Sequence, residues 1–212
     1  MPSRETARRV PALLPGLLLV ILGASGFAVL LDAVLERRLA DHRTGWLTTV
    51  FTTITTVFGP YVLPVIVAVG CGIWGWRTHR WRDPVMLVGA MVFSTVVSTV
   101  VKSLVARPRP SGELQTVPGV ESSFSFPSGH TIGAATLVLV GGYLLWREAR
   151  TRSAFVEWSV VSVVVVLVVA ASRLYLGYHF ITDVLAGTTS AVDPVQLTWT
   201  SLPSSRLLCI TT

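Results

Sequence analysis

Charged residues are scarce in this sequence of 212 residues. Asp, Glu, Lys and Arg together make up 13% of it, about half the share found in a typical soluble domain. Apolar residues make up 51%, and the mean hydropathy is +0.66. So few charges argue against a soluble globular domain, because its surface would lack solvated groups. The composition instead predicts a polytopic helical membrane protein.

Cysteine and lysine are rarer still. The two cysteines, Cys71 and Cys209, lie far apart in the sequence and predict neither a disulfide framework nor a thiolate metal site. Of the 17 Lys and Arg residues, only Lys102 is a lysine, so it is the one position where the chain does not use arginine. The formal charge of +6 comes from short clusters between apolar runs. This is the pattern of membrane topology signals, and we expect no nucleic-acid partner.

Long apolar runs dominate the rest, and a helix needs about 20 apolar residues to cross a bilayer. Five runs are interpreted as spans: residues 11–31, 61–76, 84–106, 128–146 and 155–176. The threonine-rich stretch 47–58 predicts a short interfacial helix that ends at Gly59-Pro60. The first run resembles a cleaved signal peptide near "GASG", but its length favours an anchored helix. The predicted fold class is an all-α, polytopic transmembrane helical bundle.

Orientation follows from the short basic segments at 4–9, 77–83 and 147–153. Such segments stay in the cytoplasm, so the N-terminus is predicted to be cytoplasmic in a multi-pass protein of the plasma (inner) membrane. The third span then ends outside, the fourth begins outside and the fifth ends outside. This arrangement predicts that Lys102, Arg109, His130, Arg173, His179 and Asp183 gather at the outer rim.

The stretch "FSFPSGHT" places a titratable ring where an apolar helix begins. Ser128 stands at the N-cap position, with Gly129 and His130 in the first turn. Free amide hydrogens and the positive end of the helix dipole favour an anion there. Gly129 lets the anion approach the backbone closely. The segment therefore offers both an anion site and a ring that can donate a proton.

The stretch "SRLYLGYHFITD" places His179 and Asp183 four residues apart, on one face of any helix. An aspartate beside a histidine fixes the tautomer and leaves the other ring nitrogen free to attack phosphorus. Arg173 is off that face, but Gly177 between them predicts a break that lets the two converge. Lys102 and Arg109, at the end of a span, are suited to holding an anion. Arg107 is expected to assist only electrostatically, and His42 and His79 to face solvent.

In chain order these pieces are Lys102-x6-Arg109-Pro110, Pro127-Ser128-Gly129-His130 and Ser172-Arg173-x5-His179-x3-Asp183. Together they resemble the three signature motifs of the type 2 phosphatidic acid phosphatase (PAP2) superfamily, in its membrane lipid phosphatase branch. The resemblance implies that Lys102, Arg109 and Arg173 bind phosphate oxygens, with help from Ser128 and the amides near Gly129. It implies that His179 attacks phosphorus to give a phosphohistidine, oriented by Asp183, and that His130 protonates the leaving oxygen. It also implies that no metal or other cofactor is needed, and the sequence shows no carboxylate cluster suited to Mg²⁺.

Members of that family usually carry a sixth span that begins near the last aspartate. Here the composition changes after Gly187, and ten of the next 25 residues are Ser or Thr, so no full span can form. We therefore expect five clear spans plus a truncated or aberrant sixth. The PAP2-like domain is predicted at 1–187, and an atypical polar tail outside the fold at 188–212. The hypothesis is that this tail leaves the protein impaired or unstable.

The function predicted from this resemblance is hydrolysis of a phosphomonoester or diphosphate of a lipid at the outer membrane face of a bacterium. Candidate substrates are phosphatidic acid, phosphatidylglycerol phosphate and undecaprenyl diphosphate, and membrane lipids are the other expected partners. Two alternatives remain open: a lipid phosphotransferase, and an inactive membrane protein that only binds anionic lipid headgroups. The sequence is silent on oligomeric state.

Overall fold

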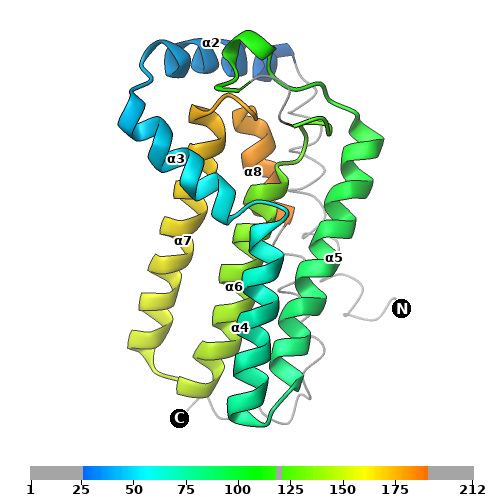
Figure 1. Cartoon of the computed structure of the whole chain (residues 1–212), viewed down its shortest axis with the longest axis vertical. Coiled ribbons are helices and arrows are strands. Elements are labelled where there is room, and N and C mark those ends of the chain that lie inside the picture. Colours follow the sequence, from blue (N-terminus) through cyan, green and yellow to red (C-terminus); the bar gives the residue numbers. More distant parts are fainter. Residues whose placement is uncertain (1–25, 118–120, 191–212) are drawn as a thin grey trace, which may run out of the picture.

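The computed structural model describes residues 26–117 and 121–190, and within these ranges all regular structure is helical (Figure 1). In chain order the elements are α2 (Gly26–Asp41), α3 (Gly45–Val57), α4 (Val62–Thr78), α5 (Arg82–Val105), the 3₁₀ turn η2 (Gly112–Leu114), α6 (Gly129–Ala149), α7 (Arg152–Tyr175) and α8 (Ile181–Ser190). The all-α prediction is confirmed for this part of the chain. The third, fourth and fifth predicted spans correspond to α5, α6 and α7.

The four helices α4 to α7 run lengthwise, and α6 packs against α5, α7 and α8 (Figure 1). Helix α2 lies across one end of this bundle, with α3 running obliquely below it. Within residues 26–117 and 121–190, three helices, α5, α6 and α7, are long and apolar enough to cross a membrane. A fourth span exists if α3 and α4, which meet at a bend of 54°, count as one broken span.

The prediction of five clear spans is therefore not confirmed. Residues 11–25 of the first predicted span lie outside the described ranges, and the chain from Gly26 onward belongs to α2. The second predicted span is α4, which is 17 residues long and too short to qualify by itself. The threonine-rich stretch is a helix, α3, that ends just before Gly59-Pro60 as predicted. At the other end of the sequence, α8 runs to Ser190. The prediction for the tail beyond it lies outside the described residues.

The core lies between α4, α5 and α6. Its buried side chains are Leu63, Val67, Cys71, Leu87, Ala90, Val140 and Leu144. Helices α6 and α7 approach so closely that a Cβ added to Gly142 would lie 1.9 Å from the Trp158 ring. Such contact depends on small residues, which let helix backbones pack tightly in an apolar setting.

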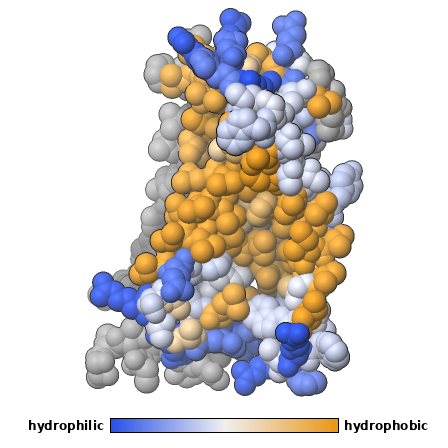
Figure 2. Space-filling model, turned by 60° about the vertical axis from the view of Figure 1, so that its left-hand side comes forward, coloured by the Kyte–Doolittle hydropathy of each residue, from blue (hydrophilic) through white to orange (hydrophobic). Residues whose placement is uncertain are grey.

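The lengthwise faces of the bundle are apolar. Figure 2 shows a band of hydrophobic side chains between two polar ends. Exposed members of α5 and α7 include Val85, Val92, Val96, Val160, Val163 and Leu167. A surface of this kind is stable against lipid hydrocarbon and unfavourable in water. The protein is accordingly a membrane protein.

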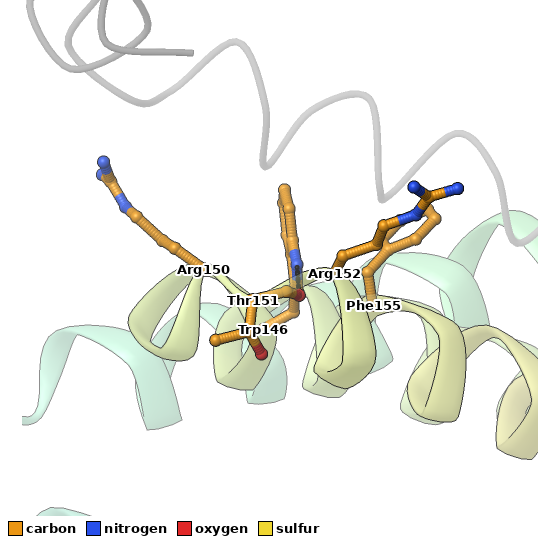
Figure 3. A pocket seen from close by; sticks show the side chains of 5 residues that line it. All are labelled: Trp146, Arg150, Thr151, Arg152 and Phe155. Atoms are coloured by element: carbon orange, nitrogen blue, oxygen red, sulfur yellow. Dashed lines mark hydrogen bonds between the residues drawn. The ribbon is translucent and has the colours of Figure 1, made fainter. Parts of the chain in front are cut away.

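The polar ends of the bundle differ in what they carry. The α4–α5 and α6–α7 connections, with the basic residues Arg80, Arg82, Arg150 and Arg152, form one end. An open hollow of about 400 Å³ lies at that end, lined by Trp146, Arg150, Thr151, Arg152 and Phe155 (Figure 3). The last turn of α5, the first turn of α6 and the last turn of α7 all lie toward the other end of the bundle, the end that carries α2 and α3. All three sequence motifs fall there.

Candidate active site

The pair His179 and Asp183 forms where α7 gives way to α8. Gly177 has φ of +76°, a left-handed conformation that residues with a side chain rarely adopt. It reverses the chain after Tyr175, so His179 and Arg173 face the same space, as predicted. His179 Nδ1 lies 3.3 Å from Asp183 Oδ2. The same carboxylate oxygen accepts a hydrogen bond of 2.9 Å from the Phe180 amide, which fixes Asp183 as the capping acid of α8.

The hydrogen bonds around His179 assign its tautomer. The residue is 1% exposed. Its Nδ1 faces the Asp183 carboxylate, an acceptor, while its Nε2 lies 3.2 Å from Arg109 Nη1, which can only donate. The proton therefore belongs on Nδ1, and the lone pair on Nε2 points among the cations. Such an imidazole can act as a nucleophile through Nε2.

The protonation state of His179 is also consistent with a nucleophile that acts through Nε2. Burial lowers its pKa well below the ordinary value, and the positive charges of Arg173 and Arg109 lower it further. The charge of Lys102 acts in the same direction. Burial disfavours the charged imidazolium, and neighbouring cations repel it. His179 is therefore neutral near pH 7, which keeps its Nε2 lone pair available.

Two arginines from distant motifs meet in front of this ring. Arg109 Nη2 forms an ion pair of 2.7 Å with Glu121 Oε2, and Arg173 Nη2 pairs with the other oxygen of the same carboxylate. Arg173 is fully buried, and its Nη1 donates to Thr55 Oγ1 at 2.5 Å. Its guanidinium also lies 4.8 Å from the centre of the Tyr178 ring. The arginines form the fork-like arrangement that binds planar or tetrahedral oxyanions.

Lys102 and His130 complete the cluster. Lys102 Nζ donates to the Phe124 carbonyl at 2.5 Å, from the last turn of α5. His130 lies in the first turn of α6, and its Nε2 lies 3.6 Å from where a Cβ on Gly59 would be. It is near enough to Glu121 for an electrostatic interaction between the two side chains. The ring therefore borders the cationic cluster from the side of the α3–α4 bend.

Ser128 and Gly129 lie at the predicted positions at the start of α6, but Ser128 makes other contacts than those of an N-cap side chain. Ser128 is the N-cap residue of α6, but its side chain makes no capping hydrogen bond. Its Oγ instead accepts from Thr131 Oγ1 at 3.1 Å, and its amide donates to the Asp183 carbonyl at 3.0 Å. The residue is fully buried. Ser128 thus ties α6 to α8, while Gly129 is exposed at the helix start.

Arg107 does more than the electrostatic assistance predicted from the sequence. Its Nη1 donates to Asp183 Oδ1 at 2.9 Å, and its Nη2 donates to Asp32 Oδ2 at 2.8 Å. Asp32, on α2, is 1% exposed and also accepts from the Ile181 amide at 3.0 Å. The guanidinium therefore links the α2 carboxylate to the partner of His179.

Three further residues of the cluster were missed by the sequence analysis. Ser125 donates to Asp183 Oδ2 and lies 3.4 Å from His179 Nδ1. Glu121 is an acid in the loop between the first two motifs, and Asp32 is an acid that directly follows an apolar run. An acid at such a position is a signal of a buried partner. Within the described ranges no group of three or more His, Cys, Asp or Glu side chains is placed to hold a metal ion.

Comparison with protein families decides which family this chain belongs to. The family model of the PAP2 superfamily matches residues 83–203, more than half of the chain. The chain belongs to the PAP2 superfamily. The resemblance read from its three motifs is thereby confirmed, and so is its class as a membrane phosphatase of that superfamily.

The names of individual relatives of this PAP2 protein describe phosphatases that act on lipids. It is 38% identical over 161 residues to phosphatidylglycerophosphatase B of Bacillus subtilis, covering 74% of this chain and 75% of the relative. It is 31% identical over 118 residues to lipid A 4'-phosphatase of Porphyromonas gingivalis, covering 50% and 47%. Among solved structures, the transmembrane PAP2 type phosphatidylglycerolphosphate phosphatase from Bacillus subtilis matches with a TM-score of 0.77 and 30% identity. That match covers 93% of this chain and 98% of the other.

Proposed function

We propose that this PAP2 protein hydrolyses a phosphomonoester or diphosphate carried by a lipid, through a phosphohistidine on His179. The observation that carries the proposal is the neutral, buried imidazole whose Nε2 faces Arg109 and whose Nδ1 faces Asp183. A nucleophile oriented by a carboxylate and surrounded by cations is suited to attack an anionic phosphoryl group.

The chemistry proceeds in two steps. Arg109, Arg173 and Lys102 bind the phosphate oxygens, with the first-turn amides near Ser128 and Gly129 as further donors. His179 Nε2 forms a bond to phosphorus as the bond from phosphorus to the lipid oxygen breaks, and His130 gives that oxygen a proton. Water then attacks phosphorus, the bond from phosphorus to His179 Nε2 breaks, and His130 takes a proton from the water, so inorganic phosphate leaves and His179 is restored. Asp183 holds the Nδ1 proton throughout.

We propose that the reaction needs no metal ion, because the cationic side chains supply the charge stabilisation that a divalent ion otherwise provides. The substrate class includes phosphatidic acid, phosphatidylglycerol phosphate and undecaprenyl diphosphate, and the name of the Bacillus subtilis relative favours the second. The proposed location is the outer face of the plasma membrane. In support, the basic connections lie at the end of the bundle opposite the cluster.

The test is phosphate release by the purified full chain from a panel of these lipids, with and without EDTA. We expect release in both conditions, and its loss in His179→Ala and His130→Ala. His42→Ala is the matched control, because His42 is exposed and bonds only to the Arg38 carbonyl, in the last turn of α2, among the described residues. Absence of release from every lipid would reject the proposal. Phosphate found on an added alcohol instead of in solution would indicate a phosphotransferase.

A further inference from the structure

Glu121 lies where a phosphate group is expected to bind. Its two carboxylate oxygens accept from two different guanidinium groups: Oε1 from Arg173, and Oε2 from Arg109 at 2.7 Å. These are the two arginines assigned above to the phosphate oxygens. The glutamate side chain is only 20% exposed. Its carboxylate therefore joins Arg109 and Arg173, and it supplies an anion from the protein itself at the proposed phosphate site.

The hydrogen bonds of Arg109 leave no donor free for a second anion. A guanidinium group has five N–H donors. Its Nε donates to the Ser123 carbonyl, its Nη1 faces the Tyr178 carbonyl and His179 Nε2, and its Nη2 donates to Ser123 Oγ and Glu121. Among these five bonds, only the bond to Glu121 joins Arg109 to an anion. A phosphate oxygen can therefore take the place of the Glu121 carboxylate oxygen and form the same kind of charge-assisted bond.

The Glu121 carboxylate does not satisfy every hydrogen-bond donor of Arg173. Its Nε is buried and has no hydrogen-bond partner within the described residues. A buried donor without a partner is unfavourable. A carboxylate has two oxygens and a phosphoryl group has three, so the larger anion can reach a donor that Glu121 leaves unsatisfied.

Glu121 is charged at every physiological pH. Burial alone raises its pKa, but the positive charges of Arg173 and Arg109 outweigh burial and lower the pKa to about 2. Protonation therefore does not clear the site, and an incoming anion must exchange with an ionised carboxylate.

We propose that Glu121 is the resident anion of the phosphate site, and that a phosphoryl group binds by displacing its carboxylate from Arg109 and Arg173. This inference rests on the proposed function for the choice of ligand. Glu121 thereby sets the affinity of the site: it keeps the two arginines paired when the site is empty, and it weakens the binding of phosphate and of phosphate-like anions.

The experiment measures the binding of orthovanadate and of inorganic phosphate to the purified full chain by isothermal titration calorimetry, with no lipid substrate present. Glu121→Gln keeps the shape of the side chain and removes its charge. We expect it to bind both anions about tenfold more tightly, because the anion no longer replaces a charge-assisted pair. Glu113→Gln is the matched control, since Glu113 is exposed in the same loop and forms no ion pair among the described residues.

A second variant and a second measurement protect the test against misfolding. Glu121→Asp keeps the charge but is too short to bridge both arginines, and we expect it also to tighten binding. The rise in Tm caused by phosphate is expected to be larger in both variants than in the wild type. Unchanged or weaker anion binding in Glu121→Gln would overturn the inference and show that Glu121 only positions the arginines. Because no turnover is measured, this result is separate from a failure of the proposed function, which appears as absent phosphate release.

Discussion

Arg107 and Asp183 form a buried ion pair directly behind the proposed nucleophile. Arg107 Nη1 lies 2.9 Å from Asp183 Oδ1, and its other terminal nitrogen lies 2.8 Å from Asp32 Oδ2. Both carboxylates have fully buried side chains. One planar guanidinium thus fixes the distance between α2 and the start of α8, and with it the carboxylate that orients His179.

Arg107→Lys is expected to lower kcat strongly while changing KM less. Lysine keeps the charge but cannot donate to Asp32 and Asp183 in the same fixed geometry. A shift of Asp183 turns His179 away from phosphorus, and misplacement by about 1 Å costs up to about 100-fold in rate. Steady-state phosphate release measures both constants. Arg80→Lys is the control, since Arg80 pairs with Glu148 at 3.9 Å on the exposed surface. Equal kcat in the two variants would contradict the prediction.

Gly177→Ala is expected to destabilise the fold. The backbone at Gly177 has φ of +76°, and a Cβ there would lie 2.1 Å from the Leu114 carbonyl oxygen. The left-handed conformation alone costs roughly 1–3 kcal/mol for a residue with a side chain. We expect Tm in detergent to fall by several degrees. Gly72→Ala, inside α4 with nothing within 4 Å of the added Cβ, should leave Tm unchanged or raise it. A Gly177→Ala protein as stable as the wild type would show that the turn is not required.

Glu36→Gln is expected to raise Tm at pH 8 and to have little effect at pH 5. Burial, followed by the charges of Asp32 and Asp183, raises the pKa of Glu36 from 4.5 to about 7. Its Oε1 has no hydrogen-bond partner among the described residues. The unfolded chain loses this proton near pH 4.5 and the folded chain near pH 7, so stability falls as pH rises between the two values.

Above pH 7 the buried charge of Glu36 remains as a constant penalty, which the neutral glutamine removes. Thermal unfolding of both proteins at pH 5 and pH 8 measures the difference. Glu113→Gln, at an exposed position, supplies the background effect of a removed charge. A gain in Tm that is the same at both pH values would mean that Glu36 is not the titrating group.

Replacement of residues 191–212 by an apolar helix is expected to increase stability and phosphate release. The described part of α8, Ile181–Ser190, carries Asp183 and is about 15 Å long. The Ser- and Thr-rich sequence that follows is too polar to complete a span of about 30 Å of hydrocarbon. An apolar continuation would anchor α8 in the bilayer and hold Asp183 in place. Tm and specific activity before and after the exchange provide the comparison. Values that do not change would remove the hypothesis that the polar tail impairs the protein.

Much of the fold was predictable because lipid imposes a simple rule on sequence. Apolar runs of sufficient length predicted α5, α6 and α7, and Gly59-Pro60 predicted the end of α3. The number of spans was harder to predict, because α3 and α4 are separated by a bend of 54°. Whether such a pair forms one span depends on packing against α7 and α5, and hydropathy carries no information about that packing.

The sequence by itself determined that the three motifs gather at one end of the bundle, and that His179 has an aspartate partner. Both follow from local spacing: a four-residue interval, a glycine at the turn, and helices that reverse direction at basic connections. Only the tertiary structure decided which acids meet which arginines. Asp32 and Arg107 are 75 residues apart, and Glu121 and Arg173 are 52 apart. Ion pairs over such intervals depend on how the helices pack, because a chain's covalent spacing does not constrain side chains that distant from one another.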